Sequence, residues 1–394
     1  MQRPDVAIVG GGLAGSLAAA ALGRAGIEAI LIDPHAEYPR DLRCEKFDPE
    51  QVAILQRTGI ADAILPAMGR ADELRVARFG HVLDQKPGRQ YGMLYHDIVN
   101  TVRRAIPPRI PRALAKVTAI ETSADRQTVT LATGEKISAR LVVLAIGLNP
   151  GLRHTLGLEK KELSHAHSIT AGFDVKPVGR ANFEFPALTY YPERASDKGA
   201  YLTLFPTPSA MRANYMCYRG LDDPWILRLR KDPYGALTEV MPHLEKAIGK
   251  FEVAGEMRIR PADLYITEGY EQPGIVLIGD AFSTSCPAAG TGAGKAINDV
   301  AQLCNVHIPA WLASDGMDAG KIATFYADAV KQDYDRRSIE RAYALRAVST
   351  DPSLRYAAKR WIAFLGRAGI GIARRLGDRV RPRSAGETPK VSHV

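Results

Sequence analysis

The sequence predicts an α/β protein in which a parallel-sheet domain is interrupted by an antiparallel sheet and followed by a helical C-terminal extension. Residues 5–33 show a buried strand, a helix rich in small residues and a second buried strand, which together make a βαβ unit. Between about residues 164 and 270, aromatic and polar residues alternate in short runs between Pro and Gly, a pattern typical of antiparallel strands. The buried run 274–279 then resumes the α/β pattern, and helical segments follow it.

These elements predict three structural parts. The N-terminal βαβ unit, the short β-branched runs between residues 113 and 148, and the strand at 274–279 belong to one discontinuous domain, to which we assign residues 1–72, 97–163 and 273–330. The inserted antiparallel-sheet domain takes residues 73–96 and 164–272. Residues 331–394 form the helical C-terminal extension.

The composition is that of a folded intracellular protein. With 394 residues, 46% hydrophobic and 24% charged, the chain is long enough for two or three cores. Its four cysteines are far apart and form no C-x-x-C, which fits a reduced cytosol and neither a disulfide framework nor a cysteine zinc site. The longest clear apolar run, 141–148, is too short for a membrane span of about 20 residues. We therefore predict a cytoplasmic protein that is not an integral membrane protein.

The formal net charge of +9 is concentrated near the C-terminus. From Lys321 onwards the chain holds 16 of its 52 Lys and Arg but only 7 of its 43 Asp and Glu. The rest of the chain is neutral, whereas proteins that bind nucleic acid carry a basic patch on the folded body. No nucleic-acid partner is therefore expected.

The C-terminal extension contains a basic amphipathic helix. Its apolar residues recur at spacings of three and four, and its basic residues lie beside them; the apolar stripe is Leu354, Ala358, Trp361, Leu365, Ala368, Ile372 and Leu376, and the basic residues are Arg355, Lys359, Arg367 and Arg374. We favour a helix docked on the body through this stripe. The alternative is contact with an anionic membrane, which would make the protein peripheral, or with an acidic carrier protein.

A glycine motif and an acidic residue lie within the N-terminal βαβ unit. Gly10, Gly12 and Gly15 form G-x-G-x-x-G between strand and helix, with Leu13 and Ala14 at the helix start. The first glycine permits the tight turn, the second lets the backbone approach a pyrophosphate, and the third packs helix against strand. Asp33 closes the second strand, where its carboxylate accepts from a ribose 2′-hydroxyl and repels a 2′-phosphate. The motif therefore predicts the ADP half of FAD or NAD rather than NADP.

A second strand–acid–loop–helix cluster follows residue 278. The segment IGDAFSTSCPAAGTGAGKAINDV resembles the GDAxH…PxxGxGxN…DA segment of FAD-dependent monooxygenases of the aromatic-hydroxylase type, which have the p-hydroxybenzoate hydroxylase fold. The resemblance covers most of residues 1–310 and implies a Rossmann-type (GR2-like) FAD domain. It also implies FAD-binding positions at Asp280, Pro287, Gly290, Thr291 and Gly292, with Asp280 on the ribityl chain, and at Arg43 beside the flavin and pyrophosphate.

Three departures from the family pattern concern the reduction of the flavin. The aspartate of the family's middle motif ADGxxSxxR is Ile146, although Gly147 and Arg153 match. The motif histidine and asparagine of the second cluster are Ser283 and Gly294, and Tyr95 stands where the family has an arginine. Since the missing aspartate is implicated in contacts to NAD(P)H, the electron donor stays open between NAD(P)H and a separate flavin reductase.

The resemblance implies a monooxygenase. Reduced FAD reacts with O2 to give a C4a-hydroperoxide, which hydroxylates or epoxidises an apolar or aromatic small molecule. The candidates for the substrate pocket are the aromatic residues Tyr191, Tyr201, Phe205 and Tyr215 of the inserted sheet. The alternatives are an FADH2-using reductase similar to geranylgeranyl reductase, a halogenase on the same flavin cradle, and a flavin-binding carrier or sensor without turnover.

No metal site is predicted. His165 and His167 are the only close histidine pair, and on a strand they would share one face. A metal would need further ligands that the sequence does not place, so we interpret both as structural residues.

Overall fold

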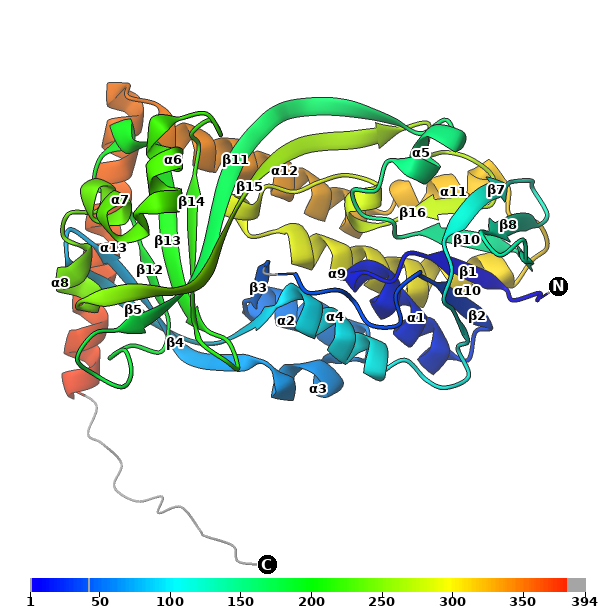
Figure 1. Ribbon diagram of the computed structural model, residues 1–394, viewed down its shortest axis with the longest axis horizontal. Helices are drawn as coiled ribbons and strands as arrows, with labels where there is room; N and C mark the ends of the chain where they lie inside the picture. Colours follow the sequence, from blue (N-terminus) through cyan, green and yellow to red (C-terminus); the bar gives the residue numbers. More distant parts are fainter. Residues whose placement is uncertain (1, 42, 381–394) are drawn as a thin grey trace, which may run out of the picture.

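The computed structural model describes residues 2–41 and 43–380. Its two main sheets lie toward opposite ends of the long axis, and the long strands β11 and β15 run between them (Figure 1). Among the described residues, no helix is both long and apolar enough to cross a membrane.

The first sheet is parallel and has the strand order β16–β10–β1–β2–β6. Its strands are β1 (Val6–Val9), β2 (Ala29–Ile32), β6 (Arg112–Ala113), β10 (Leu141–Leu144) and β16 (Ile275–Leu277). All but β6 are buried along their whole length. Helix α1 (Leu13–Ala25) packs against α4 (Tyr95–Arg104) and α9 (Gly292–Gln302). The βαβ unit and the strand near residue 275 are thus confirmed as parts of one parallel sheet.

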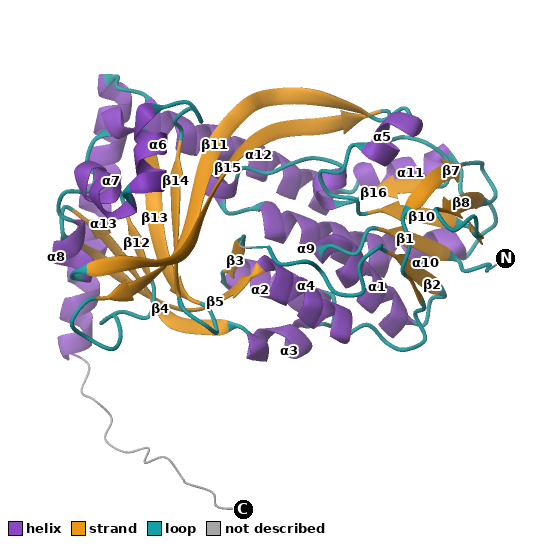
Figure 2. Cartoon of the chain, in the orientation of Figure 1, coloured by secondary structure: helices purple, strands orange, loops and turns teal. Residues whose placement is uncertain are grey.

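The second sheet has eight strands in the order β15–β11–β14–β13–β12–β4–β5–β3 and is antiparallel except between β12 and β4 (Figure 2). Its strands are β3 (Cys44–Phe47), β4 (Gly69–Arg78), β5 (His81–Leu94), β11 (Glu159–Pro177), β12 (Leu188–Tyr190), β13 (Gly199–Pro206), β14 (Met211–Cys217) and β15 (Phe251–Glu268). Apolar residues of α6 (Pro224–Lys231), α7 (Pro233–Val240) and α8 (Leu244–Ile248) form a second core on one face of this sheet.

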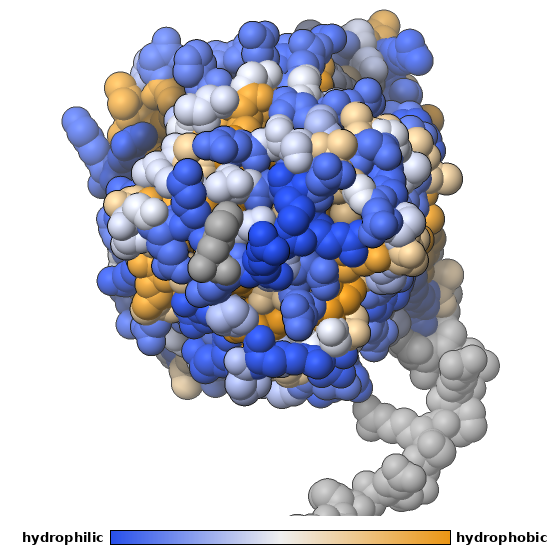
Figure 3. All heavy atoms as spheres, turned by 90° about the vertical axis from the view of Figure 1, so that its right-hand side faces the viewer, coloured by the Kyte–Doolittle hydropathy of each residue, from blue (hydrophilic) through white to orange (hydrophobic). Residues whose placement is uncertain are grey.

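Smaller elements complete the parallel-sheet half of the molecule. A three-stranded meander of β7 (Val117–Glu121), β8 (Gln127–Leu131) and β9 (Lys136–Ala139) lies beside the sheet. The remaining helices of this half are α2 (Pro49–Arg57), α3 (Ala61–Ile64), α5 (Gly151–Thr155), α10 (Ile308–Leu312) and α11 (Ala319–Tyr326). This end of the molecule presents a mainly hydrophilic surface with scattered apolar residues (Figure 3).

Two long helices end the described chain: α12 runs from the parallel-sheet half to the antiparallel sheet, and α13 lies along the antiparallel-sheet end (Figure 1). Helix α12 (Ala329–Thr350) packs against α9 and β13, and α13 (Leu354–Val380) packs against β5 (Figure 1). The predicted helical extension is therefore present. The part of the extension from residue 381 onwards lies outside the described residues.

Candidate functional site

One large cavity, of about 1760 Å³, extends from the parallel sheet to the face of the antiparallel sheet. At one end it is lined by the turns after β1, β2, β10 and β16, which are the carboxyl ends of parallel strands, where open α/β sheets bind their ligands. At the other end it is lined by β4, β13, β14, α12 and α13. A pocket for one small ligand measures roughly 300–1,000 Å³, so this cavity accommodates a large cofactor together with a second molecule.

The glycine turn after β1 has the geometry that the motif predicts. Gly10 has a φ of +101°, and a Cβ there would lie 2.5 Å from the Ala145 carbonyl oxygen. A Cβ on Gly15 would lie 1.8 Å from the Gly10 carbonyl oxygen, so only glycine lets α1 pack this close. Gly12, Leu13 and Ala14 line the cavity, and no side chain caps α1 at Gly12. The first turn of α1 therefore presents free N–H groups to a ligand.

Asp33 is held at the end of β2 by groups of the same turn. Its carboxylate accepts the Gly11 N–H at 2.8 Å and lies 3.1 Å from the guanidinium of Arg103. Arg103, buried on α4, also donates to the carbonyls of Gly11 and His35. Arg103 was not predicted as a site residue. It lies 92 positions after Gly11 in the sequence, and nothing in the sequence around it indicates a contact with the glycine turn. It fixes the acidic residue at the rim of the cavity.

Arg43 lies in an aromatic and acidic setting on the cavity wall. Its guanidinium pairs with Asp41 at 2.7 Å and lies 4.0 Å from the centre of the Tyr95 ring. The Tyr95 hydroxyl accepts the Leu13 N–H at 3.2 Å, so Tyr95 joins the arginine to the first turn of α1. Burial would raise the pKa of the Asp41 carboxyl, but hydrogen bonds from Arg43 hold it below its usual value. Arg43 therefore stays charged and aligned beside the glycine turn.

The turn after β16 is anchored by two buried side chains. The carbonyl oxygen of Asp280 accepts from Arg153 at 2.9 Å and from the Tyr265 hydroxyl at 2.7 Å, while the Asp280 side chain lines the cavity. Burial raises the pKa of the Asp280 carboxyl, and the positive charges of Lys295 and Arg43 oppose this rise. Arg153 also donates to the Gly147 carbonyl at 3.0 Å. The arginine of the middle motif thus connects two of the turns that surround the cavity.

A buried ionic cluster supports the same turn from behind. Asp299 on α9 accepts the Gly279 N–H at 2.9 Å and pairs with Lys331 of α12 at 2.8 Å. Lys295 lies 3.6 Å from Asp299 and 3.5 Å from Asp335, and Lys331 lies 3.0 Å from Asp335. Two cations and two carboxylates therefore balance inside the protein. Lys331 comes from the C-terminal extension, and its role was missed because the pairing is decided by how α12 packs on α9.

The loop before α9 is open toward the cavity. Gly290 has a φ of +68°, and no atom lies within 4 Å of the position where its Cβ would be. Gly290, Gly292 and Pro287 line the cavity. Thr291 does not: its hydroxyl hydrogen-bonds to the Ser338 hydroxyl at 2.6 Å, away from the cavity. The loop thus offers backbone at the N-terminus of α9, whereas Thr291 fixes the loop to α12.

The aromatic candidates divide between the two faces of the antiparallel sheet. Tyr191, Tyr201 and Phe205 line the cavity. Tyr215 does not; it is buried in the second core, 5.4 Å from the Trp225 ring. The register explains this, because Tyr201 pairs with Met216, whose side chain shares its face, and successive residues of a strand point to opposite faces. The cavity residues of β14 are therefore Arg212, Asn214 and Met216.

Glu45 was not predicted and lines the cavity on β3, next to Arg43. Burial raises the pKa of its carboxyl to about 7, which the charge of Arg43 partly opposes. No described residue donates a hydrogen bond to this carboxylate. A half-buried acid that titrates near neutral pH inside a cavity is suited to proton exchange with whatever occupies the cavity.

The arrangement fits FAD. A dinucleotide needs close backbone approach at its pyrophosphate, an acid at its ribose and a second turn at its other end, and the chain provides Gly10–Gly12, Asp33 and Asp280 around one continuous cavity. Arg43 supplies a positive charge between the two turns. The residues predicted for the cofactor and for the substrate pocket are therefore brought together around one cavity, apart from the side chains of Thr291 and Tyr215.

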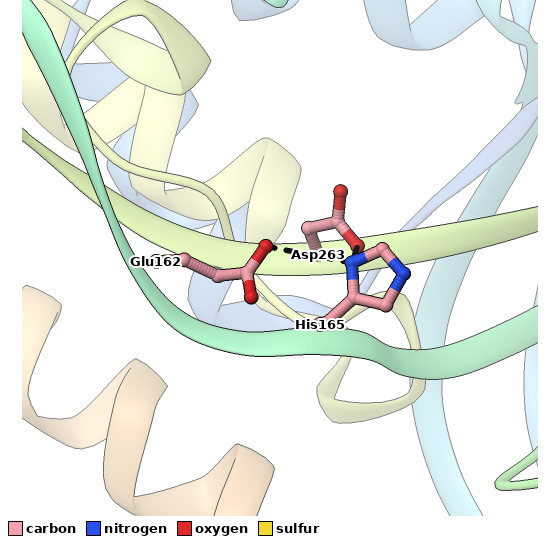
Figure 4. Close-up of side chains that lie close together, drawn as sticks. All are labelled: Glu162, His165 and Asp263. Carbon is pink, nitrogen blue, oxygen red and sulfur yellow. Dashed lines mark ion pairs between the residues drawn. The ribbon is translucent and has the colours of Figure 1, made fainter.

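The two histidines lie in different environments, contrary to the expectation that they share a face. The register of β11 against β15 is irregular between Ser164 and Ser168, and Ala166 has a φ of +40°. His165 is exposed, whereas His167 is buried between the Ser164 hydroxyl and the Ala342 carbonyl. His165 approaches Glu162 and Asp263 to 3.4 Å each (Figure 4). All three side chains are exposed, and exposed groups of acidic residues are common on proteins without a metal ion.

Comparison with known proteins identifies the family. The chain belongs to the FAD binding domain family, whose model matches residues 3–308. It is 24% identical over 338 residues to 3-amino-4-hydroxybenzoate 2-monooxygenase from Streptomyces platensis, and the alignment covers 82% of this chain and 81% of that protein. It is 27% identical over 335 residues to 3-demethoxyubiquinol 3-hydroxylase from Escherichia coli, and that alignment covers 78% of this chain and 81% of that protein. The crystal structure of p-nitrophenol 4-monooxygenase from Pseudomonas putida superposes with a TM-score of 0.73 at 15% identity, covering 94% of this chain and 95% of that chain.

The chain is accordingly an FAD-dependent monooxygenase of the aromatic-hydroxylase type. The family confirms the predicted cofactor and the predicted oxidoreductase class. Flavin-dependent halogenases share this fold, so the fold is compatible with the halogenase alternative. At 15–17% identity, these structures do not support that alternative from the sequence.

Proposed function

We propose that this monooxygenase hydroxylates or epoxidises an apolar aromatic small molecule at the aromatic wall of the cavity, with O2 as co-substrate. The observation that carries the proposal is that Tyr191, Tyr201 and Phe205 line the same continuous cavity as the two glycine turns. The relatives named above act on substituted aromatic or quinol rings. Bound FAD supplies the oxygen-transfer chemistry, and the chain's own residues bind it, orient the substrate and limit the access of water.

The proposed FAD contacts are the residues predicted from the sequence, adjusted to their positions in the structure. The first turn of α1 would hold the pyrophosphate, Asp33 would accept from the ribose, and Asp280 and Arg43 would bind the ribityl chain and pyrophosphate. Gly290 and Gly292 present backbone to the flavin ring, while Thr291 acts through the loop. Glu45 exchanges a proton with the reacting molecules, since its carboxylate faces the cavity without a protein donor.

The division into domains is proposed as predicted, with support from sheet membership. The ranges 97–163 and 273–330 hold β6, β10 and β16 of the parallel sheet, and the strands in 73–96 and 164–272 belong to the antiparallel sheet. Strand β3 and the first residues of β4 also pair in the antiparallel sheet, although they fall within 1–72. Residues 1–72 therefore also contribute the β3 edge of the antiparallel sheet.

Reduction of the flavin is proposed to depend on a separate flavin reductase rather than on direct reaction with NAD(P)H. Ile146 lines the cavity where the family pattern has an aspartate, so an apolar side chain stands in place of an acceptor for a nicotinamide nucleotide. Anaerobic stopped-flow mixing tests this directly. We expect slow reduction by NADH and NADPH, with or without phenolic substrates; reduction at many turnovers per second would refute the need for a reductase.

The reaction is tested by product analysis under 18O2. Purified protein should be yellow or take up FAD; with chemically or enzymatically reduced FAD and a panel of phenols and quinols, we expect one labelled oxygen atom in the product. Saturation of a double bond without label would instead establish the FADH2-using reductase, and halide incorporation the halogenase. A reduced flavin that reacts with neither O2 nor any substrate would establish a carrier or sensor.

Contact of the basic C-terminal helix with an anionic surface, a membrane or an acidic carrier protein, also belongs to this proposal. The charge distribution along the sequence supports it. Such contact would place a peripheral enzyme close to a store of apolar substrate.

A further inference from the structure

Helix α13 docks on the body through a face other than its apolar stripe. Gly371 lies so close to the Leu83 carbonyl of β5 that a Cβ would not fit, and Arg374 pairs with the buried Asp84 at 2.7 Å. Phe364 packs edge-on against Phe79 at 5.6 Å. The docked face therefore consists of small, aromatic and paired basic residues, and the expectation that the predicted stripe is the docked face is wrong.

The predicted stripe faces outward instead. Its large apolar side chains Leu354, Leu365 (62%) and Ile372 are exposed, and Ile362, which lies beside the stripe, is 70% exposed. Trp361 stacks on Phe79 at 6.2 Å along one edge and is also more than half exposed. With Ala358 and Ala368 between them, the stripe residues recur at spacings of three and four and make one row along the helix, with Ile362 at its edge. An exposed apolar row of this length is unusual on a soluble surface and marks an interaction site.

The charges around the stripe are all positive. From Leu354 to Arg374 the helix carries five basic residues and no acidic residue. Arg355 and Lys359 are exposed beside the stripe, whereas Arg360 donates to the Val348 and Asp351 carbonyls, and Arg374 is the residue paired with Asp84. The free charge therefore lies on the solvent side of the helix, next to the apolar row.

The cavity reaches this helix. Arg367 of α13 lines the cavity and lies 4.7 Å from the centre of the Tyr191 ring. Tyr191 meets Tyr201 at 6.1 Å between ring centres, and the Tyr201 hydroxyl donates to the Ala288 carbonyl in the loop before α9. Leu345 and Val348 of α12 line the same end of the cavity. An aromatic row thus leads from α13 to the loop proposed to hold the flavin.

We propose that α13 is an interfacial helix that binds an anionic membrane surface through its exposed apolar stripe, and that apolar substrate enters the cavity from the membrane past Arg367 and Tyr191. The route of entry rests on the proposed oxygenation reaction, whereas membrane binding does not depend on that reaction. The stripe inserts among the acyl chains, Arg355 and Lys359 meet anionic headgroups, and the docked face keeps the cavity end beside the bilayer.

Charge complementarity favours a membrane over a second copy of the chain. Two α13 helices joined through their stripes would bring two basic segments, 354–374 of each copy, close together, and like charges at close spacing repel. An anionic membrane removes this repulsion and covers the same apolar row. The opposite end of the molecule, by contrast, shows a mainly hydrophilic surface (Figure 3).

Vesicle sedimentation tests the surface. The full chain, the double variant Ile362→Glu/Leu365→Glu and the control Leu114→Glu, which places the same change at a 56% exposed leucine beside β6, are mixed with phosphatidylcholine vesicles containing or lacking about 30% phosphatidylglycerol. We expect the full chain and the control to sediment with the anionic vesicles and the double variant to bind at least about tenfold more weakly. Binding of the full chain should weaken in about 0.5 M salt.

Three results would overturn the proposal: negligible sedimentation of the full chain, equal binding by the double variant, and a concentration-dependent dimer in light scattering that the double variant abolishes. FAD content and melting temperature of each variant show whether it is folded. Turnover of a water-soluble phenol without vesicles reports on the proposed function separately. Loss of that turnover in every protein, with vesicle binding intact, would refute the reaction and leave the membrane surface standing.

The entry route has its own readout. With an apolar substrate dissolved in the vesicles, we expect the double variant to show a raised KM and an unchanged kcat, while its KM for the water-soluble phenol stays that of the full chain. An equal KM for the vesicle-borne substrate in both proteins would refute entry from the membrane.

Discussion

Replacing Lys331 by Met tests whether the buried ionic cluster behind the Asp280 turn stabilises the site. Lys331 is 1% exposed. Its ammonium lies 2.8 Å from the Asp299 carboxylate and 3.0 Å from the Asp335 carboxylate. Methionine has a similar volume, so Lys331→Met removes the charge with little change in packing. The cluster then holds two carboxylates against the single ammonium of Lys295, at 3.6 and 3.5 Å.

Breaking a buried ion pair by removing one partner costs about 3–5 kcal/mol. The lower end applies here, because Lys295 remains and Asp335 is partly open to solvent. A loss of about 3 kcal/mol corresponds to a fall in melting temperature of about 4 °C for a chain of this length. In the native protein, burial would raise the pKa of Asp299, but Lys295, Lys331 and the Gly279 N–H hold it below its usual value. Without Lys331 the pKa of Asp299 rises, so the folded variant binds a proton more readily than the folded parent, and its stability deficit grows as pH increases.

Thermal melts of the FAD-loaded protein at pH 5 and pH 8, together with FAD dissociation constants, measure these effects. The double variant Lys331→Met/Asp299→Asn restores charge balance and keeps an acceptor for the Gly279 N–H, so it should recover most of the lost stability. A melting temperature for Lys331→Met within 1 °C of the parent, or a double variant less stable than the single one, would refute the electrostatic explanation.

Three further changes probe the cavity directly. Gly15→Ala should abolish FAD retention, since a Cβ would lie 1.8 Å from the Gly10 carbonyl oxygen; purified variant with parental flavin absorbance would contradict this. Burial raises the pKa of Glu45 to about 7, so ionisation of Glu45 lowers the folding stability as pH rises from about 4.5 to 7. Glu45→Gln should remove this fall in stability, by at most about 2 kcal/mol. An unchanged slope of melting temperature against pH over this range would contradict the prediction. Tyr201→Phe removes the hydroxyl that donates to the Ala288 carbonyl and should cost about 1 kcal/mol, seen as a severalfold lower kcat with FAD affinity changed by less; parental kcat would show that the hydroxyl does not position the loop.

The sequence determined the proposed FAD-binding half of the site because its signals are local. Gly10 and Gly15 are required by backbone conformation and close packing within one βαβ unit, and the acid at position 33 follows from the length of that unit. The second motif fixed the turn at Asp280 and the open loop at Gly290 in the same way. Short-range sterics leave few residues that fit such turns, so the choice of residue reveals the structure.

Tertiary structure decided what depends on contacts between distant elements. The register between β13 and β14 turns Tyr215 away from the cavity that Tyr201 lines, and the irregular register of β11 separates His165 from His167. Composition alone does not specify a register.

The long-range partners have the same origin. Arg103 meets Asp33, and Lys331 meets Asp299, only because helices pack together. The orientation of α13 was decided in this way too: hydrophobic spacing predicts an amphipathic helix but not which face meets the protein. Close packing at Gly371 and the pairing of Arg374 with Asp84 selected the docked face and left the apolar stripe exposed.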